Sequence, residues 1–171
     1  MPANTTPVAA QTIEALRALV QADADRRIED LTELVAIPSI AWDGLDPAHV
    51  EASAHRVAEL FKEAGLDDVR LLNAVAADGV QGRTAVVARR EAAPGMPTVL
   101  MYAHHDVQPI GDEALWDTPP FVATRKGDRL FGRGAADDKA GIMVHIGALR
   151  AVTAAAAAEG LGLTYFIEGE E

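Results

Sequence analysis

The run Thr98-Val-Leu-Met-Tyr102 constrains the fold more than any other segment of this chain. Its apolarity is continuous instead of alternating, which is typical of a central strand covered on both faces. On either side of this run, strand-like and helix-like segments interleave along the 171 residues. The interleaving predicts an α/β sandwich with a mixed, largely parallel sheet.

Three helices are predicted around this strand. Apolar residues recur on one side of the segment 11–35. In the second helix Asp46 can cap the start, Pro47 fits the first helical position and Gly65 fits the stop. The third helix is expected over 139 to about 158, where apolar residues are dense.

Further strands are expected where β-branched and apolar residues gather between turn signals. They cover 69–72, 84–88 and 163–167, with a hairpin formed by 121–124 and 129–131. The sequence has no internal repeat, so a single domain is expected from residue 10 onward, after a disordered leader over 1–9.

Charge and composition exclude several classes of function. The net charge of −11 argues against nucleic acid or an anionic membrane as partner. The chain has no cysteine, no signal-peptide pattern and no apolar stretch near the roughly 20 residues of a membrane span. We therefore expect a cytoplasmic protein.

Three polar motifs each follow a predicted strand or turn. They are Tyr102-Ala-His-His-Asp-Val-Gln-Pro109, the pair Asp137-Asp138, and Glu168-Gly-Glu-Glu171. Several other catalytic signatures are missing from the sequence: the Gly-x-Ser-x-Gly elbow, the phosphate-binding Gly-x-x-x-x-Gly-Lys loop, and His-Glu-x-x-His. Hydrolysis by metal-activated water is the chemistry that remains.

The residue types in these motifs suit a metal site. Side chains two residues apart in an extended segment point the same way, so Asp106 could accept the far ring N–H of His104. Asp137 could bridge two cations, and cations about 3.5–4 Å apart can hold a water. Of Glu170 and Glu171, one could bind metal while the other takes the water's proton.

Each motif also has a structural interpretation without chemistry. A single His-x-Asp is often a surface turn, and Glu-Gly-Glu-Glu is often a solvated acidic tail. We expect Asp138 to be an N-terminal helix cap, favoured by the helix dipole. His49, His55 and His145 fall within helical patterns and are expected to be surface or core residues.

Taken together and in order, the motifs resemble one family. It is the co-catalytic di-zinc metallopeptidases that include carnosine-type dipeptidases, aminoacylases, glutamate carboxypeptidases and desuccinylases. The likeness covers about 12–171, and it includes Leu130-Phe-Gly-Arg-Gly-Ala-Ala-Asp-Asp-Lys139. The sequence Asp-Val-Gln-Pro is more similar to the dipeptidase branch of this family than to the desuccinylase branch. The resemblance implies a three-layer zinc-peptidase-like sandwich.

The resemblance also implies roles, position by position. His104, Asp137 and Glu171 match metal ligands, with Asp137 bridging two Zn2+ ions (Mn2+ or Co2+ are alternatives) and preceding a cis peptide bond. Asp106 matches the partner that orients the imidazole, and Glu170 matches the general base. His105 stands where the family often has another residue.

The resemblance predicts that residues 10–171 are the N-terminal portion of a catalytic domain. A further Asp ligand, a distant His ligand and the lid or dimerisation domain would lie beyond residue 171. Each metal would then keep two protein ligands, whereas catalytic zinc normally holds three. The chain alone is therefore expected to be inactive, as a fragment of an enzyme whose full-length form could be a homodimer.

The leading hypothesis is metal-dependent hydrolysis of dipeptides or short peptides. One alternative is an N-acyl amino acid amidohydrolase on the same fold. The other is a non-catalytic remnant that acts as a binding module.

Overall fold

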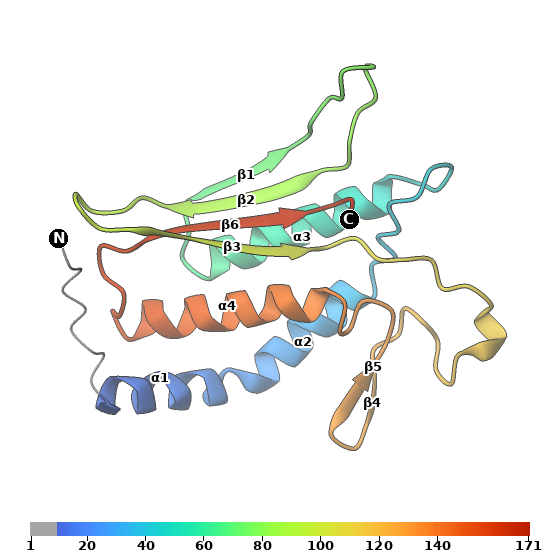
Figure 1. Cartoon of the computed structure of the whole chain (residues 1–171). Helices are drawn as coiled ribbons and strands as arrows, with labels where there is room; N and C mark the ends of the chain where they lie inside the picture. Colours follow the sequence, from blue (N-terminus) through green and yellow to red (C-terminus); the bar gives the residue numbers. More distant parts are fainter. Residues whose placement is uncertain (1–9) are drawn as a thin grey trace.

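The computed structural model describes residues 10–171, so the leader predicted over 1–9 lies outside the described residues. Four strands form one sheet in the order β1-β2-β6-β3, and β4 pairs with β5 in a separate hairpin (Figure 1). The elements in chain order are α1 (Ala10–Ala22), α2 (Ala24–Val35), α3 (Ala48–Glu63), β1 (Asp68–Leu72), β2 (Ala85–Arg90), β3 (Thr98–His104), the 3-10 helix η1 (Glu113–Leu115), β4 (Thr124–Lys126), β5 (Arg129–Phe131), α4 (Lys139–Ala154) and β6 (Gly162–Glu168).

The sheet is mixed, which confirms the predicted α/β class. Strands β3 and β6 are parallel and are joined through α4, because a parallel pair needs a crossover connection. The pairs β1–β2 and β2–β6 are antiparallel. The sheet of residues 10–171 is therefore mixed, as predicted, but the parallel pair is a minority in it.

The helices form the core against one face of the sheet. Helix α3 packs on β1 and β2, helix α4 packs on β3, and α1 packs on α4 rather than on the sheet (Figure 1). Phe61 of α3 stacks near Tyr165 of β6, with 4.8 Å between the ring centroids. Both side chains are buried, together with Leu34, Ile142 and Ile146 from the other helices.

The opposite face of the sheet is open in the described part of the chain. Leu100 and Tyr102 of β3 and Phe166 of β6 project from it and are exposed, Leu100 by 68%. Strand β3 also lies at the edge of the sheet. Within residues 10–171 the predicted central strand and third layer are therefore not seen, because helices cover one face alone.

Local signals placed most helix ends correctly. Asp46 accepts a hydrogen bond from the Ala48 backbone N–H at 2.9 Å, and Gly65 follows α3 with a φ of +98°. The predicted helix over 11–35 is instead two helices separated at Asp23. None of the helices described for residues 10–171 has the length and apolarity to cross a membrane.

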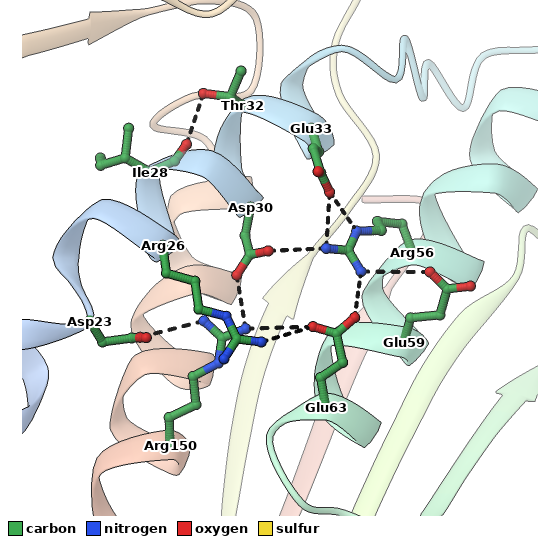
Figure 2. Close-up of polar contacts among 10 residues, drawn as sticks. All are labelled: Asp23, Arg26, Ile28, Asp30, Thr32, Glu33, Arg56, Glu59, Glu63 and Arg150. Carbon is green, nitrogen blue, oxygen red and sulfur yellow. Dashed lines mark hydrogen bonds and ion pairs between the residues drawn. The ribbon is translucent and has the colours of Figure 1, made fainter.

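An ion-pair network links α2, α3 and α4 on the outside of this core (Figure 2). Asp30 accepts hydrogen bonds from Arg56 at 3.0 Å and from Arg150 at 2.8 Å. Glu63 accepts from Arg56 at 3.0 Å and from Arg26 at 3.1 Å. We call this the helix ion-pair network; its charged members are Asp23, Arg26, Asp30, Glu33, Arg56, Glu59, Glu63 and Arg150.

Candidate metal centre

The polar motifs meet at the carboxyl end of the parallel pair β3–β6. His104 ends β3 and lies opposite Glu168, which ends β6. Because the two strands run the same way, the residues that follow them reach the same edge of the sheet, near the C-terminus in Figure 1. Asp137 arrives at this edge from the turn before α4. We call these acidic residues and His104 the sheet-edge cluster: His104, Asp106, Asp137, Asp138, Glu170 and Glu171.

His104 lies at the centre of three carboxylates. Its Nε2 is 3.1 Å from Asp137 Oδ1 and 3.7 Å from Glu171 Oε2. Its Nδ1 is 3.3 Å from Asp106 Oδ1, which is the contact that the two-residue spacing predicts. Asp106 also accepts a hydrogen bond from the Glu171 backbone N–H at 3.3 Å. The four residues therefore form one connected group, and the imidazole has a carboxylate on each nitrogen.

The donor atoms at Nε2 suit zinc in type and separation. Two ligands that each lie 2.0–2.1 Å from a tetrahedral zinc are about 3.4 Å apart. The separations of 3.1 and 3.7 Å lie on either side of that value. No group of three or more His, Asp or Glu side chains among residues 10–171 is arranged to hold one ion. The cluster therefore offers pairs of ligands.

Burial and charge shift the pKa values of this group. Burial lowers the pKa of His104, but the hydrogen bond to Asp137 and the charges of Asp106, Glu171 and Asp138 outweigh it, so that the pKa is raised. Burial raises the pKa of Asp106, against the opposing effect of His104. In residues 10–171 no Lys or Arg side chain forms an ion pair with the cluster, so its negative charge is in excess.

Asp138 does not act as the expected side-chain cap. The residue occupies the N-cap position of α4, but its side chain makes no cap hydrogen bond. Its Oδ2 instead accepts a hydrogen bond from the His104 backbone N–H at 3.3 Å, which turns the carboxylate toward β3. The peptide bond between Asp137 and Asp138 is cis, as the resemblance implied.

Glu170 lies beside the imidazole group rather than in it. Its Oε2 accepts a hydrogen bond from the Arg83 backbone N–H at 2.9 Å. With Glu171 and Asp106 it lines a cleft of about 410 Å³. Glu168, the first acid of the same motif, points away and accepts from the Tyr102 hydroxyl at 2.7 Å. The motif Glu168-Gly-Glu-Glu171 thus supplies a carboxylate beside His104, a second carboxylate at the cleft, and a third that contacts Tyr102 on the open face.

Sequence reasoning missed the other wall of the cleft. That wall consists of Ala41, Trp42 and Asp43 from the loop after α2. The Arg83 side chain joins it to the β1–β2 loop, because its Nε donates to the Ala41 carbonyl at 3.4 Å. An isolated Trp in a polar loop was the available signal for Trp42. The sequence did not indicate a role for Arg83, because its backbone N–H, and not its side chain, donates the hydrogen bond to Glu170.

An α/β domain with imidazole and carboxylate donors at the carboxyl edge of its sheet has the architecture of a metallopeptidase catalytic domain. Comparison with known proteins agrees with this class. The model of Peptidase family M20/M25/M40 matches residues 100–171 of this chain.

Curated relatives extend the likeness to most of the chain. The cysteinylglycine-S-conjugate dipeptidase of Corynebacterium striatum is 34% identical over 149 residues, which are 86% of this chain and 31% of that protein. The Beta-Ala-His dipeptidase of Rattus norvegicus is 29% identical over 97% of this chain and 35% of its own length. The chain therefore spans about a third of the length of these relatives.

Solved structures show the same fold. The di-peptidase Dug1p from Saccharomyces cerevisiae superposes with a TM-score of 0.82 and 23% identity, over 94% of this chain and 35% of that one. Human carnosine dipeptidase 1 superposes with a TM-score of 0.78 and 25% identity, over 91% and 34%. The arrangement of β1-β2-β6-β3 and its helices therefore matches about a third of each of these chains.

Proposed function

We propose that this chain is part of an enzyme that hydrolyses the peptide bond of dipeptides or short peptides with a bound metal. The observation that carries the proposal is the sheet-edge cluster. There, His104 meets Asp106, Asp137 and Glu171 beside a cleft that holds Glu170. The names of the relatives, all dipeptidases, support a small peptide as substrate.

The chain's own residues divide the work of binding and orientation. His104, Asp137 and Glu171 would hold zinc, with Asp137 placed to bridge two ions. Bound zinc would polarise the substrate carbonyl and make water a nucleophile at neutral pH. Asp106 would orient the imidazole, because a carboxylate that accepts the Nδ1–H favours the neutral tautomer whose Nε2 lone pair can bind metal.

Glu170 would move the proton. Its Oε2 is tied to the Arg83 N–H, so Oε1 is the atom left to take a proton from water and pass it to the leaving amine. The carboxylate stands in the cleft, beside Asp106 and Glu171. General base catalysis of this kind contributes roughly 10²–10⁴-fold to the rate.

We expect the complete site to need residues that are not in this chain. His104 with Asp137, or Asp137 with Glu171, gives each ion two protein ligands, and catalytic zinc normally has three. The full-length enzyme is therefore the form in which activity is expected. A cytoplasmic location and a homodimer stay predictions for it.

The test is hydrolysis by the full-length protein loaded with Zn²⁺, on Cys-Gly, β-Ala-His and N-acetylated amino acids. We expect cleavage of dipeptides that stops when a chelator removes the metal. Glu170→Gln should lower kcat by about 10²–10⁴-fold with zinc content unchanged. Cleavage of the N-acetyl substrates alone would replace the dipeptidase assignment, and full turnover by Glu170→Gln would remove the role given to Glu170.

A further inference from the structure

His105 is a fully buried residue between two residues of the candidate site. Its backbone N–H donates to the Glu168 carbonyl at 2.8 Å, which joins the end of β3 to the end of β6. Its carbonyl accepts hydrogen bonds from Ser39 Oγ at 2.7 Å and from Ser53 Oγ at 3.3 Å. Both serines are also fully buried. The backbone of His105 therefore holds β6, the loop after α2, and α3 together.

The imidazole of His105 makes a further link, to the start of β2. Its Nε2 lies 2.8 Å from the Thr84 carbonyl, so Nε2 carries the proton and donates it. Burial lowers the pKa of this imidazole to about 4, and the ring is neutral at physiological pH. Its Nδ1 makes no hydrogen bond within the part of the chain that the structure describes. The one polar contact of the ring is thus with Thr84.

The same ring packs against the backbone just before Glu170. A Cβ atom added to Gly169 would lie 2.3 Å from the Thr84 carbonyl oxygen and 2.9 Å from His105 Nε2. Such separations are too short for any side chain, so Gly169 is needed where the ring and the carbonyl meet it. The imidazole and Thr84 therefore form a support on which Gly169 rests.

This support reaches Glu170 from two directions. Gly169 precedes Glu170 in the chain, and Thr84 follows Arg83, whose N–H holds Glu170 Oε2 at 2.9 Å. A shift of the 83–84 segment relative to Gly169 would change both the backbone and the carboxylate of Glu170. Among the side-chain hydrogen bonds of the 83–84 segment, the one from His105 Nε2 to the Thr84 carbonyl comes from a ring that also packs against Gly169.

We propose that His105 is a positioning residue for Glu170, acting through its Nε2 hydrogen bond to the Thr84 carbonyl. The proposal rests on the proposed function for the part that concerns turnover. The proposal concerns the side chain of residue 105, because the hydrogen bond to Thr84 depends on the imidazole and not on the backbone at that position.

The experiment compares His105→Gln with His105→Leu in the zinc-loaded full-length protein. Gln can place its amide N–H near the position of Nε2, whereas Leu fills similar space without a donor. We expect His105→Leu to lower kcat by about 10–100-fold with KM and zinc content nearly unchanged, as for loss of an outer contact. His105→Gln should recover most of the rate. Equal kcat values for the two variants would overturn the proposal.

A double variant separates positioning from simple loss of stability. If His105 acts through Glu170, His105→Leu should cost little further rate in a Glu170→Gln background. The same 10–100-fold loss in both backgrounds would contradict the proposal. Should the Leu variant fail to fold, His105→Phe keeps a ring of similar size without the donor and takes its place.

Hydrogen exchange of the Arg83 amide tests the geometry without any activity. This amide is the donor to Glu170, so its exchange reports the contact directly. We expect faster exchange in His105→Leu and wild-type exchange in His105→Gln. Unchanged exchange in both variants would overturn the positioning role. If dipeptides are not cleaved at all, the proposed function fails while this measurement still decides the role of His105.

Discussion

Two groups of acidic side chains lie on this small domain, and they differ in how their charge is balanced. In the helix ion-pair network, Asp30 receives one guanidinium group from α3 and another from α4 (Figure 2). In the sheet-edge cluster, three of the five carboxylates share the one imidazole of His104, and the other two accept from backbone N–H groups. The first group is matched by cations of the protein, whereas the second leaves negative charge unmatched.

The difference explains what each group does. Close carboxylates repel one another, and a protein keeps them together where function requires it. Three arginines remove that cost in the network, which then joins helices α2, α3 and α4. In the sheet-edge cluster the repulsion between carboxylates remains, and a bound cation would remove it. Acidic density alone therefore does not indicate a metal site; what distinguishes the proposed site is that, within residues 10–171, its carboxylates form no ion pair with Arg or Lys.

The largest expected effect is that of Asp137→Asn on activity. Removing the carboxylate that is proposed to hold metal should lower dipeptide hydrolysis by the full-length protein by roughly 10³-fold or more, because bound metal contributes several kcal/mol of transition-state stabilisation. Zinc content should fall with it. Thermal unfolding in the presence of a chelator should be unchanged or improved, since one repelling charge is lost. If the variant has a lower Tm than the wild type in chelator, Asp137 stabilises the fold, and the contrast between the sheet-edge cluster and the helix ion-pair network does not hold.

The next effect is on stability, at Asp30. Its side chain is 9% exposed and lies between Arg56 and Arg150. Asp30→Ala should destabilise the protein by about 3 kcal/mol, as when one member of a buried pair is removed. Urea unfolding would measure this. Hydrolysis per folded molecule should stay at the wild-type level, and a loss comparable with that of Asp137→Asn would contradict the division between the two groups.

A smaller effect concerns the acid side of the pH profile. Burial raises the pKa of Glu63, but Arg56 and Arg26 outweigh it and hold the pKa below its ordinary value of 4.5. A depressed carboxyl pKa adds stability above about pH 4.5, and that stability is lost as the pH falls through the folded pKa. Because the side chain is 41% exposed, the contribution is below about 1 kcal/mol.

Urea unfolding between pH 3 and 7 tests this contribution. Glu63→Gln should lower stability at pH 7 and should show a shallower loss toward pH 3 than the wild type. Identical slopes for the two proteins would mean that Glu63 is not held by the network.

The smallest effect is expected at the rim of the network. Glu59 lies 3.6 Å from Arg56 Nη1, and its side chain is 65% exposed. Glu59→Ala should therefore change stability by less than about 0.5 kcal/mol, as for most exposed ion pairs. Comparing the stability changes of Glu59→Ala and Asp30→Ala shows whether the burial of an ion pair or the number of ion pairs determines the stability of the network. A change as large as that of Asp30→Ala would show that the network acts as one unit.

Local patterns identified most of the elements, because their signals lie within a few residues. Gly65 follows the end of α3, Asp46 accepts from the first N–H of that helix, and the apolar run before His104 is a strand. The order of strands depends on contacts between distant segments. The central position predicted for β3, which lies at an edge within residues 10–171, and the single helix predicted over 11–35 were for that reason wrong.

The sequence by itself determined the residue types and the order of the sheet-edge motifs. His104 and Asp106 were expected to meet because the spacing of a strand is local, and they do. The tertiary structure alone decided that Asp138 turns to His104, that Arg83 holds Glu170, and that His105 supports Gly169. These contacts join residues between 34 and 87 positions apart, and two of them use backbone atoms, which every residue type carries.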